Sequence, residues 1–107
     1  MIMNATKKKV SFNELIQSET PVLVDFYANW CGPCKMLSPV LADLASKHSG
    51  DIQVVKIDVD KNPGAAQKLQ VRGVPTMMLF KNGEILWRKS GYMSLAQLES
   101  ELQPHMA

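Results

Sequence analysis

The only two cysteines of this 107-residue chain, Cys31 and Cys34, flank Gly32 and Pro33 in the segment YANWCGPCKM. A thiol can act as a nucleophile, a metal ligand or one half of a disulfide. Two thiols three residues apart on a helix lie on the same face, so they can bond to each other or act in turn on a third sulfur atom. The pair therefore admits four interpretations: a zinc site, a haem attachment site, a structural disulfide or a redox-active dithiol.

The surrounding sequence argues against zinc and haem. A structural zinc site needs four ligands, but the chain has no second cysteine pair, and His48 and His105 lack the spacing of a zinc motif. Covalent haem attachment requires a histidine directly after the second cysteine, where this chain has Lys35. We therefore predict that the cysteines bind no metal.

A purely structural disulfide is the plainest alternative. A bond between Cys31 and Cys34 closes a very short loop, so it would stabilise the fold by only about 2 kcal/mol in the loop-closure model. A protein of a reducing compartment would not normally keep a disulfide for stability. Because the gain is small, we favour a redox function over a structural one.

The local pattern supports a redox-active dithiol. If a strand ends near Trp30 and a helix begins at the motif, Cys31 lies near the unpaired N–H groups and the positive end of the helix dipole, where a thiolate is favoured. Cys34 could then attack a mixed disulfide formed by Cys31. Neither Gly32 nor Pro33 offers the thiolate a positive charge, which favours a reductant over an oxidant.

Length and composition predict one soluble globular domain over residues 1–107. A net charge of +2 is too small to indicate binding to nucleic acid or to an anionic membrane, and the basic run Lys7–Lys9 is expected to be a solvated surface. The N-terminal segment has no apolar run of a secretory signal or a transmembrane helix, so we expect a cytoplasmic protein. A processed form that had lost a signal would look the same.

Hydrophobic periodicity predicts alternating helices and strands. The expected helices cover residues 11–18, 34–48, 62–69 and 94–102, and the expected strands cover residues 22–28, 52–60, 76–80 and 84–88, with a further short strand possible before Ser11. Ser11 with Glu14 and Ser94 with Gln97 have capping-box spacing, and Asn62 is the expected cap of the third helix.

Two further signals predict how these elements are arranged. Pro39 falls within the second helix and should bend it. Asn82 and Gly83 are typical of a type I′ turn, so the last two strands should form an antiparallel hairpin. Strands that alternate with helices pair in parallel, and we therefore predict an α/β fold with a mixed sheet between helices.

The segments VDFYANWCGPCK, KIDVD and VRGVPTMMLFKNGE, followed by Gly91, resemble the thioredoxin family over about residues 11–102. The resemblance implies the thioredoxin fold, with parallel strands, an antiparallel C-terminal hairpin and helices on both faces. It also implies a general protein disulfide reductase that cycles between a Cys31/Cys34 dithiol and a disulfide. In that cycle Cys31 is the nucleophile and Cys34, the more buried thiol, is the resolving residue.

The resemblance assigns further roles around the cysteines. It implies that Asp25, a carboxyl group within an apolar strand, relays a proton and that Lys56 modulates it; from residue type alone, Asp25 would be hydrogen-bonded and Lys56 would lie at a strand edge. It implies a cis bond between Val74 and Pro75, with the backbone of Val74 pairing with an extended substrate segment.

The resemblance also places Trp30, Gly73 and Gly91 in a flat apolar surface around the nucleophile, although a tryptophan is ordinarily a core residue. The sequence departs from the family pattern at Tyr27, where many relatives have a tryptophan, and at Trp87. It departs again at Tyr92 and Met93, which together with Met77 are expected to narrow the range of partners.

The chain has no cofactor-binding motif, so the resemblance implies that electrons come from NADPH through an external flavoprotein thioredoxin reductase. The expected partners are that reductase and proteins that contain disulfides, and the expected state is a monomer. Two alternatives remain: a thioredoxin-fold binding module with incidental cysteines, and an oxidase or isomerase.

Overall fold

The structure is a computed structural model that describes residues 11–106. Four strands form one sheet in the order β2-β1-β3-β4. The strands are β1 (Val22–Tyr27), β2 (Gln53–Asp58), β3 (Thr76–Lys81) and β4 (Glu84–Ser90). β1 pairs in parallel with β2 and antiparallel with β3, and β3 pairs antiparallel with β4. The predicted mixed sheet with a C-terminal hairpin is confirmed, but the expectation that strands separated by a helix pair in parallel holds only for β1 and β2, because β3 pairs with β1 antiparallel.

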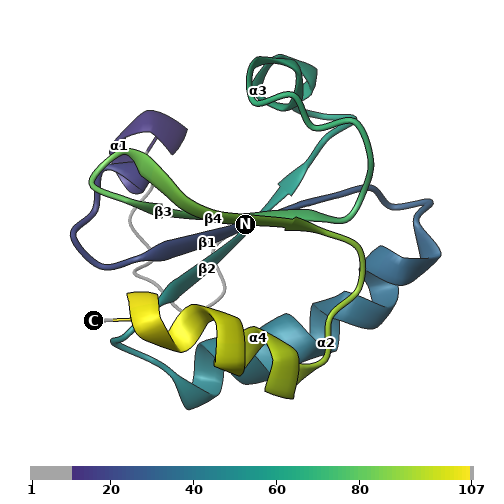
Figure 1. The fold of residues 1–107 in the computed structure, drawn as a ribbon. Coiled ribbons are helices and arrows are strands. Elements are labelled where there is room, and N and C mark those ends of the chain that lie inside the picture. The colour runs from purple at the N-terminus through teal and green to yellow at the C-terminus, as the bar shows by residue number, and fades with distance from the viewer. Residues whose placement is uncertain (1–10, 107) are drawn as a thin grey trace.

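Helices cover both faces of this sheet (Figure 1). On one face lie α1 (Phe12–Ile16) and α3 (Pro63–Lys68), and on the other lie α2 (Gly32–Lys47) and α4 (Leu95–Leu102), which continues into the short 3₁₀ helix η1 (Gln103–His105).

The central strand β1 is buried on both faces because its side chains alternate between two cores. Val22, Val24 and Phe26 belong to the core under α1 and α3. Leu23 belongs to the core under α2 and α4, so Asp25, two residues further along the strand, faces the same side as Leu23. Burying one such apolar side chain stabilises the fold by about 1.5–3 kcal/mol, so burial on both faces fixes the position of this strand.

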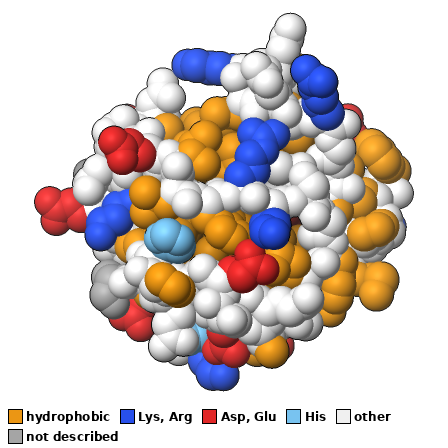
Figure 2. Space-filling model, in the orientation of Figure 1, with side chains coloured by type: hydrophobic (Ala, Val, Ile, Leu, Met, Phe, Trp, Pro, Cys, Tyr) orange, Lys and Arg blue, Asp and Glu red, His pale blue; other side chains and the backbone are white. Residues whose placement is uncertain are grey.

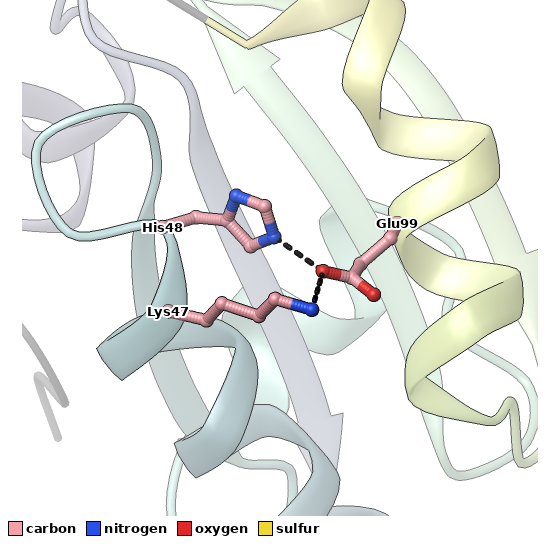
Figure 3. A network of polar contacts seen from close by, with 3 residues as sticks. All are labelled: Lys47, His48 and Glu99. Atoms are coloured by element: carbon pink, nitrogen blue, oxygen red, sulfur yellow. Dashed lines mark hydrogen bonds and ion pairs between the residues drawn. The ribbon is translucent and has the colours of Figure 1, made fainter.

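Polar contacts join the C-terminal end of α2 to α4 (Figure 3). One carboxylate oxygen of Glu99 accepts from the Lys47 ammonium at 2.9 Å and lies 2.6 Å from Nε2 of His48. These two contacts hold the pKa of Glu99 below its ordinary value. They supplement the packing of Leu98 and Leu102 in the shared core.

The element ends follow local chemistry, with one exception. Ser94 and Gln97 form the predicted reciprocal capping box. At Ser11 the hydroxyl accepts from the N–H of Glu14 at 3.1 Å, but it also donates to the Glu14 carboxylate at 3.0 Å, so the box predicted there forms only in part. Asn62 occupies the N-cap position of α3 as predicted, but its side chain makes no capping bond within the described structure, and its amide donates to the carbonyl of Asp58.

Other predicted boundaries shift slightly. α1 ends at Ile16, two residues before the predicted end, and α2 begins at Gly32, two residues before the predicted start. α2 continues through Pro39. Asn82 and Gly83 both have the positive φ, 52° and 82°, that a type I′ turn requires.

The possible strand before Ser11 and the basic run Lys7–Lys9 lie outside the described residues. Among helices in residues 11–106, none has both the length and the apolar character needed to cross a bilayer.

Candidate redox site

The two cysteines lie where β1 leads into α2. Cys31 is the N-cap residue of α2, and its sulfur accepts a hydrogen bond from the N–H of Cys34 at 3.2 Å. Gly32 and Pro33 form the first turn of the helix, where proline is tolerated because its missing N–H would have no helical partner. The sulfur of Cys31 thus lies at the positive end of the helix dipole, which favours its thiolate in the reduced protein.

Cys31 and Cys34 form a disulfide, and their Cα atoms are 5.3 Å apart. The exposed fractions of the two residues are 4% and 3%, so burial hardly distinguishes them. The N-cap position of Cys31 distinguishes them better, since it brings a backbone donor to that sulfur. Within residues 11–106, no group of three or more histidine, cysteine or acidic residues could hold a metal ion.

The loop that precedes β3 lies against the cysteines. The Val74–Pro75 peptide bond is cis, as the resemblance implies, and the carbonyl oxygen of Val74 is 3.6 Å from the sulfur of Cys31. Gly91, whose φ of 96° suits glycine, donates its N–H to the carbonyl of Pro75 at 2.9 Å. A Cβ atom added at Gly73 would meet nothing within 4 Å, so the space beside this loop is open to another chain.

Apolar side chains are exposed around the disulfide. Trp30 is 71% exposed and Met36 is 63% exposed, and Figure 2 shows hydrophobic side chains gathered at the edge of the molecule where β1 leads into α2. The expectation from residue type alone, that Trp30 lies in the core, is wrong. Its indole N–H donates to Asp60 at 2.9 Å, which leaves the ring itself in solvent.

Two methionines predicted to narrow the range of partners do not lie on this surface. Met77 is completely buried and Met93 is only 7% exposed, and both pack in the core beneath α2 and α4. Met77 pairs with Asp25 across β1 and β3, which directs its side chain inward. That prediction is therefore wrong for both methionines, whereas Tyr92 is 46% exposed.

Asp25 is completely buried, and neither of its carboxylate oxygens has a hydrogen-bond partner within the described part of the chain. Residue type alone predicted a hydrogen-bonded carboxylate, and that prediction is wrong. Burial raises the pKa of Asp25 to about 7, although the positive charge of Lys56 opposes the rise. The group can therefore both accept and release a proton near neutral pH.

Lys56 lies beside Asp25 in the parallel register of β2 with β1. Its ammonium donates to Ser38 at 2.9 Å and lies 4.6 Å from the ring centroid of Tyr27, a favourable distance for a cation–π contact. Lys56 is consequently held over the face that α2 covers, and it is not a freely solvated residue of the sheet edge.

A cavity of about 210 Å³ opens beside Cys34. Its lining includes Asn29, Lys35, Ser38 and Lys56. Asn29 and Ser38 were not predicted from the sequence as neighbours of the site. Ser38 had a detectable signal, because it follows Cys34 by four residues and thus lies on the same helical face. The cavity brings solvent and polar groups to the second thiol.

Comparison with known proteins places the chain in a family. Residues 3–104 match the family model described as Thioredoxin. The chain belongs to the thioredoxin family. Thioredoxin 1 of Chlorobaculum tepidum is 45% identical over 93 residues, which cover 86% of this chain and 92% of that protein.

Two other relatives align over almost their whole length. A thioredoxin-like protein of Synechocystis is 46% identical over 102 residues, 94% of this chain and 97% of that protein. The thioredoxin of Pseudomonas aeruginosa is 40% identical over 105 residues, 98% of this chain and 96% of that protein.

Family membership and the bonded pair together define the chemistry of this thioredoxin. It is a thiol-disulfide oxidoreductase of the protein-disulfide reductase type, and its redox centre is the Cys31–Cys34 disulfide. Thioredoxins carry this centre in their own chain and need no bound cofactor for it.

Proposed function

We propose that this thioredoxin is a general reductant of protein disulfides, with Cys31 as the nucleophile and Cys34 as the resolving thiol. The observation that carries the proposal is the position of the pair: Cys31 caps α2, and its sulfur faces the loop that contains Val74 and Pro75. A thiolate favoured by the helix terminus then lies beside a backbone segment that can hold its substrate.

The reaction proceeds in two exchanges. The Cys31 thiolate attacks one sulfur of the substrate disulfide, forms a mixed disulfide and releases the first substrate sulfur as a thiolate. The Cys34 thiolate then attacks the sulfur of Cys31, which releases the second substrate sulfur and leaves the Cys31–Cys34 disulfide. Two electrons pass from the protein to the substrate, whose two thiolates take up protons.

Asp25 removes the proton from Cys34 before the second exchange. A carboxylate of ordinary pKa would be a weak base for a thiol, but burial brings the pKa of Asp25 to about 7. Lys56 modulates this basicity because its positive charge favours the carboxylate. Asp25 becomes protonated as Cys34 becomes the nucleophile, and solvent later recovers that proton.

The substrate segment binds in an extended form along the loop at Val74. Backbone pairing provides affinity without demanding a particular side chain, which suits a reductant of many proteins. Trp30, Gly73 and Gly91 form the surface around the nucleophile, and the glycines let a partner backbone approach closely.

Regeneration requires an external donor of two electrons. A flavoprotein thioredoxin reductase using NADPH is the donor we propose. The protein would act as a monomer in the cytoplasm, with residues 1–107 as a single domain.

The primary test is reduction of insulin disulfides with dithiothreitol as the electron donor. We expect the wild-type protein to accelerate the reaction and Cys31→Ser to abolish the acceleration. Cys34→Ser should lose turnover and accumulate a mixed disulfide through Cys31. A binding module would be unaffected by the loss of Cys34, and equal activity of wild type and Cys34→Ser would refute the proposal.

Equilibration with glutathione separates a reductant from an oxidase or isomerase. The Cys31–Cys34 disulfide of a reductant has a low reduction potential, so it should persist even in reducing mixtures of reduced and oxidised glutathione. A disulfide that glutathione reduces readily, and that forms only in strongly oxidising mixtures, would identify an oxidant instead.

A further inference from the structure

The loop between α3 and β3 is attached to β4 by the side chain of one arginine. Nη1 of Arg88 donates to the carbonyl of Leu69 at 2.7 Å, and Nη2 donates to the carbonyl of Gln70 at 2.8 Å. Leu69 is the C-cap residue of α3, and Gln70 has a positive φ of 56° where the chain turns toward Val74. The guanidinium thus holds the two carbonyls at the start of this loop.

β4 also holds the other end of the loop. The N–H of Gly91 donates to Pro75, and the hydroxyl of Ser90 lies 3.0 Å from that of Thr76. The hydroxyl of Thr76 in turn donates to the carbonyl of Gly73 at 2.7 Å. β4 therefore fixes both ends of residues 69–75, while the carbonyl of Val74 between them faces the sulfur of Cys31.

From these contacts we propose that Arg88 is a positioning residue for protein substrates, because it fixes the loop whose backbone pairs with them. The inference rests on the proposed function, which assigns substrate pairing to Val74. A planar guanidinium suits this task because its two nitrogens reach two carbonyls at once in a fixed geometry. Arg88 does not touch the cysteines, so it acts on substrate binding and not on the sulfur chemistry.

The mechanism predicts selectivity between two kinds of substrate. A protein disulfide must align its backbone with the loop before its sulfur meets Cys31, so disorder at the start of the loop weakens its binding. A small disulfide such as bis(2-hydroxyethyl) disulfide has no peptide backbone to align. Loss of Arg88 should therefore impair the reduction of insulin and leave the reduction of the small disulfide unchanged.

The test uses Arg88→Met, which keeps an apolar stem and removes both donors, in single-turnover reactions of the fully reduced protein. With insulin, we expect the half-saturating concentration to rise about fivefold and the saturating rate constant to change by less than about twofold. With the small disulfide, the second-order rate constant should be unchanged. The half-saturating concentration of insulin for Arg88→Lys should lie between those of wild type and Arg88→Met, because an ammonium cannot bind two carbonyls in the fixed geometry of a guanidinium.

The matched control is Lys89→Met, which removes the same charge from the next residue of β4. The ammonium of Lys89 lies 3.9 Å from Glu101 and makes no contact with the loop in the described structure, so its kinetics should match wild type. Thermal unfolding of each variant confirms that all remain folded at the assay temperature.

Three results would overturn the role of Arg88. They are an unchanged half-saturating concentration of insulin in Arg88→Met, an equal loss with both substrates, and an equal effect of Lys89→Met. Failure of the proposed function has a different signature, because the wild-type protein itself would then fail to reduce insulin.

Discussion

Replacing Asp25 with alanine should stabilise the protein, and the gain should depend on pH. In the folded protein burial raises the pKa of Asp25 to about 7, from the ordinary value of 3.8 that applies to the unfolded chain. Between these values the folded state keeps a proton that the unfolded state has lost, so stability falls as pH rises through this window. Above about pH 7 the folded protein carries a buried carboxylate, and stability falls no further from this cause.

The size of the effect follows from the same two values. Their difference is about three, and each unit of pKa corresponds to about 1.4 kcal/mol, so the ionised carboxylate costs about 4 kcal/mol. Alanine removes this cost but leaves a small cavity, which costs about 1 kcal/mol. We therefore expect a net gain of about 3 kcal/mol in the free energy of unfolding at about pH 9, and no gain at about pH 4.

Denaturant unfolding of the oxidised proteins, followed by circular dichroism at both pH values, measures this difference. Asp58→Ala is the matched control, because Asp58 is a buried carboxylate that accepts from the N–H of Asp60 at 2.9 Å and from the amide of Asn29 at 3.3 Å. Removing that acceptor leaves donors unpaired and should destabilise the protein at about pH 9. If Asp25→Ala is no more stable than wild type at that pH, the argument from burial is refuted.

Three further predictions follow from the same structure. Lys56→Met removes the charge that lowers the pKa of Asp25, so the fall in stability should extend to higher pH in the unfolding assay. If the pH at the midpoint of this fall is unchanged, the two groups are not coupled. Asp25→Asn should slow release of the mixed disulfide by at least about tenfold and its formation much less, as rapid-quench kinetics would measure; equal effects on both steps would count against the relay. Glu99→Gln should lower stability at neutral pH, because His48 and Lys47 hold the pKa of Glu99 below its ordinary value. The loss of stability should shrink as acid protonates Glu99 in the wild type. Thermal melts from neutral to acid pH measure this loss, and a loss of constant size would argue against that origin.

Elements whose signals are local could be predicted from the sequence. The reciprocal cap of Ser94 and Gln97 depends on residues three apart, and the turn at Asn82 and Gly83 depends on adjacent residues, so both could be read directly. Asn62 takes the predicted N-cap position, but the partner of its side chain could not be predicted from neighbouring residues. Its side chain can reach either the helix that follows it or the carbonyl of Asp58, and only the path of the chain after β2 decides between them.

In the candidate site, too, some features could be predicted from neighbouring residues and others could not. The position of Cys31 at the start of a helix follows from the adjacent residues. The absence of a hydrogen-bond partner for Asp25 among residues 11–106 does not, because it depends on which side chains from other elements come near it. Likewise, the hydrogen bond from Lys56 on β2 to Ser38 on α2 could not be predicted from the sequence of either segment alone.

Burial of Met77 could have been predicted with one further step. A residue of a central strand that follows a buried pattern alternates between two covered faces, so neither face of β3 leaves a methionine in solvent. The resemblance to a family suggested a surface role from chain position alone, and the strand geometry takes precedence over it.

The direct passage from β1 into α2 has a consequence for how partners are chosen. The disulfide lies at the start of α2, just after a strand that is buried between two cores, so close packing makes it a nearly rigid template. Adaptation must then come from the other molecule, whose disulfide-bearing stretch has to loosen from its own fold and straighten before exchange. We therefore expect the order in which proteins are reduced to follow the local unfolding tendency of their disulfide loops more closely than the residues that surround them.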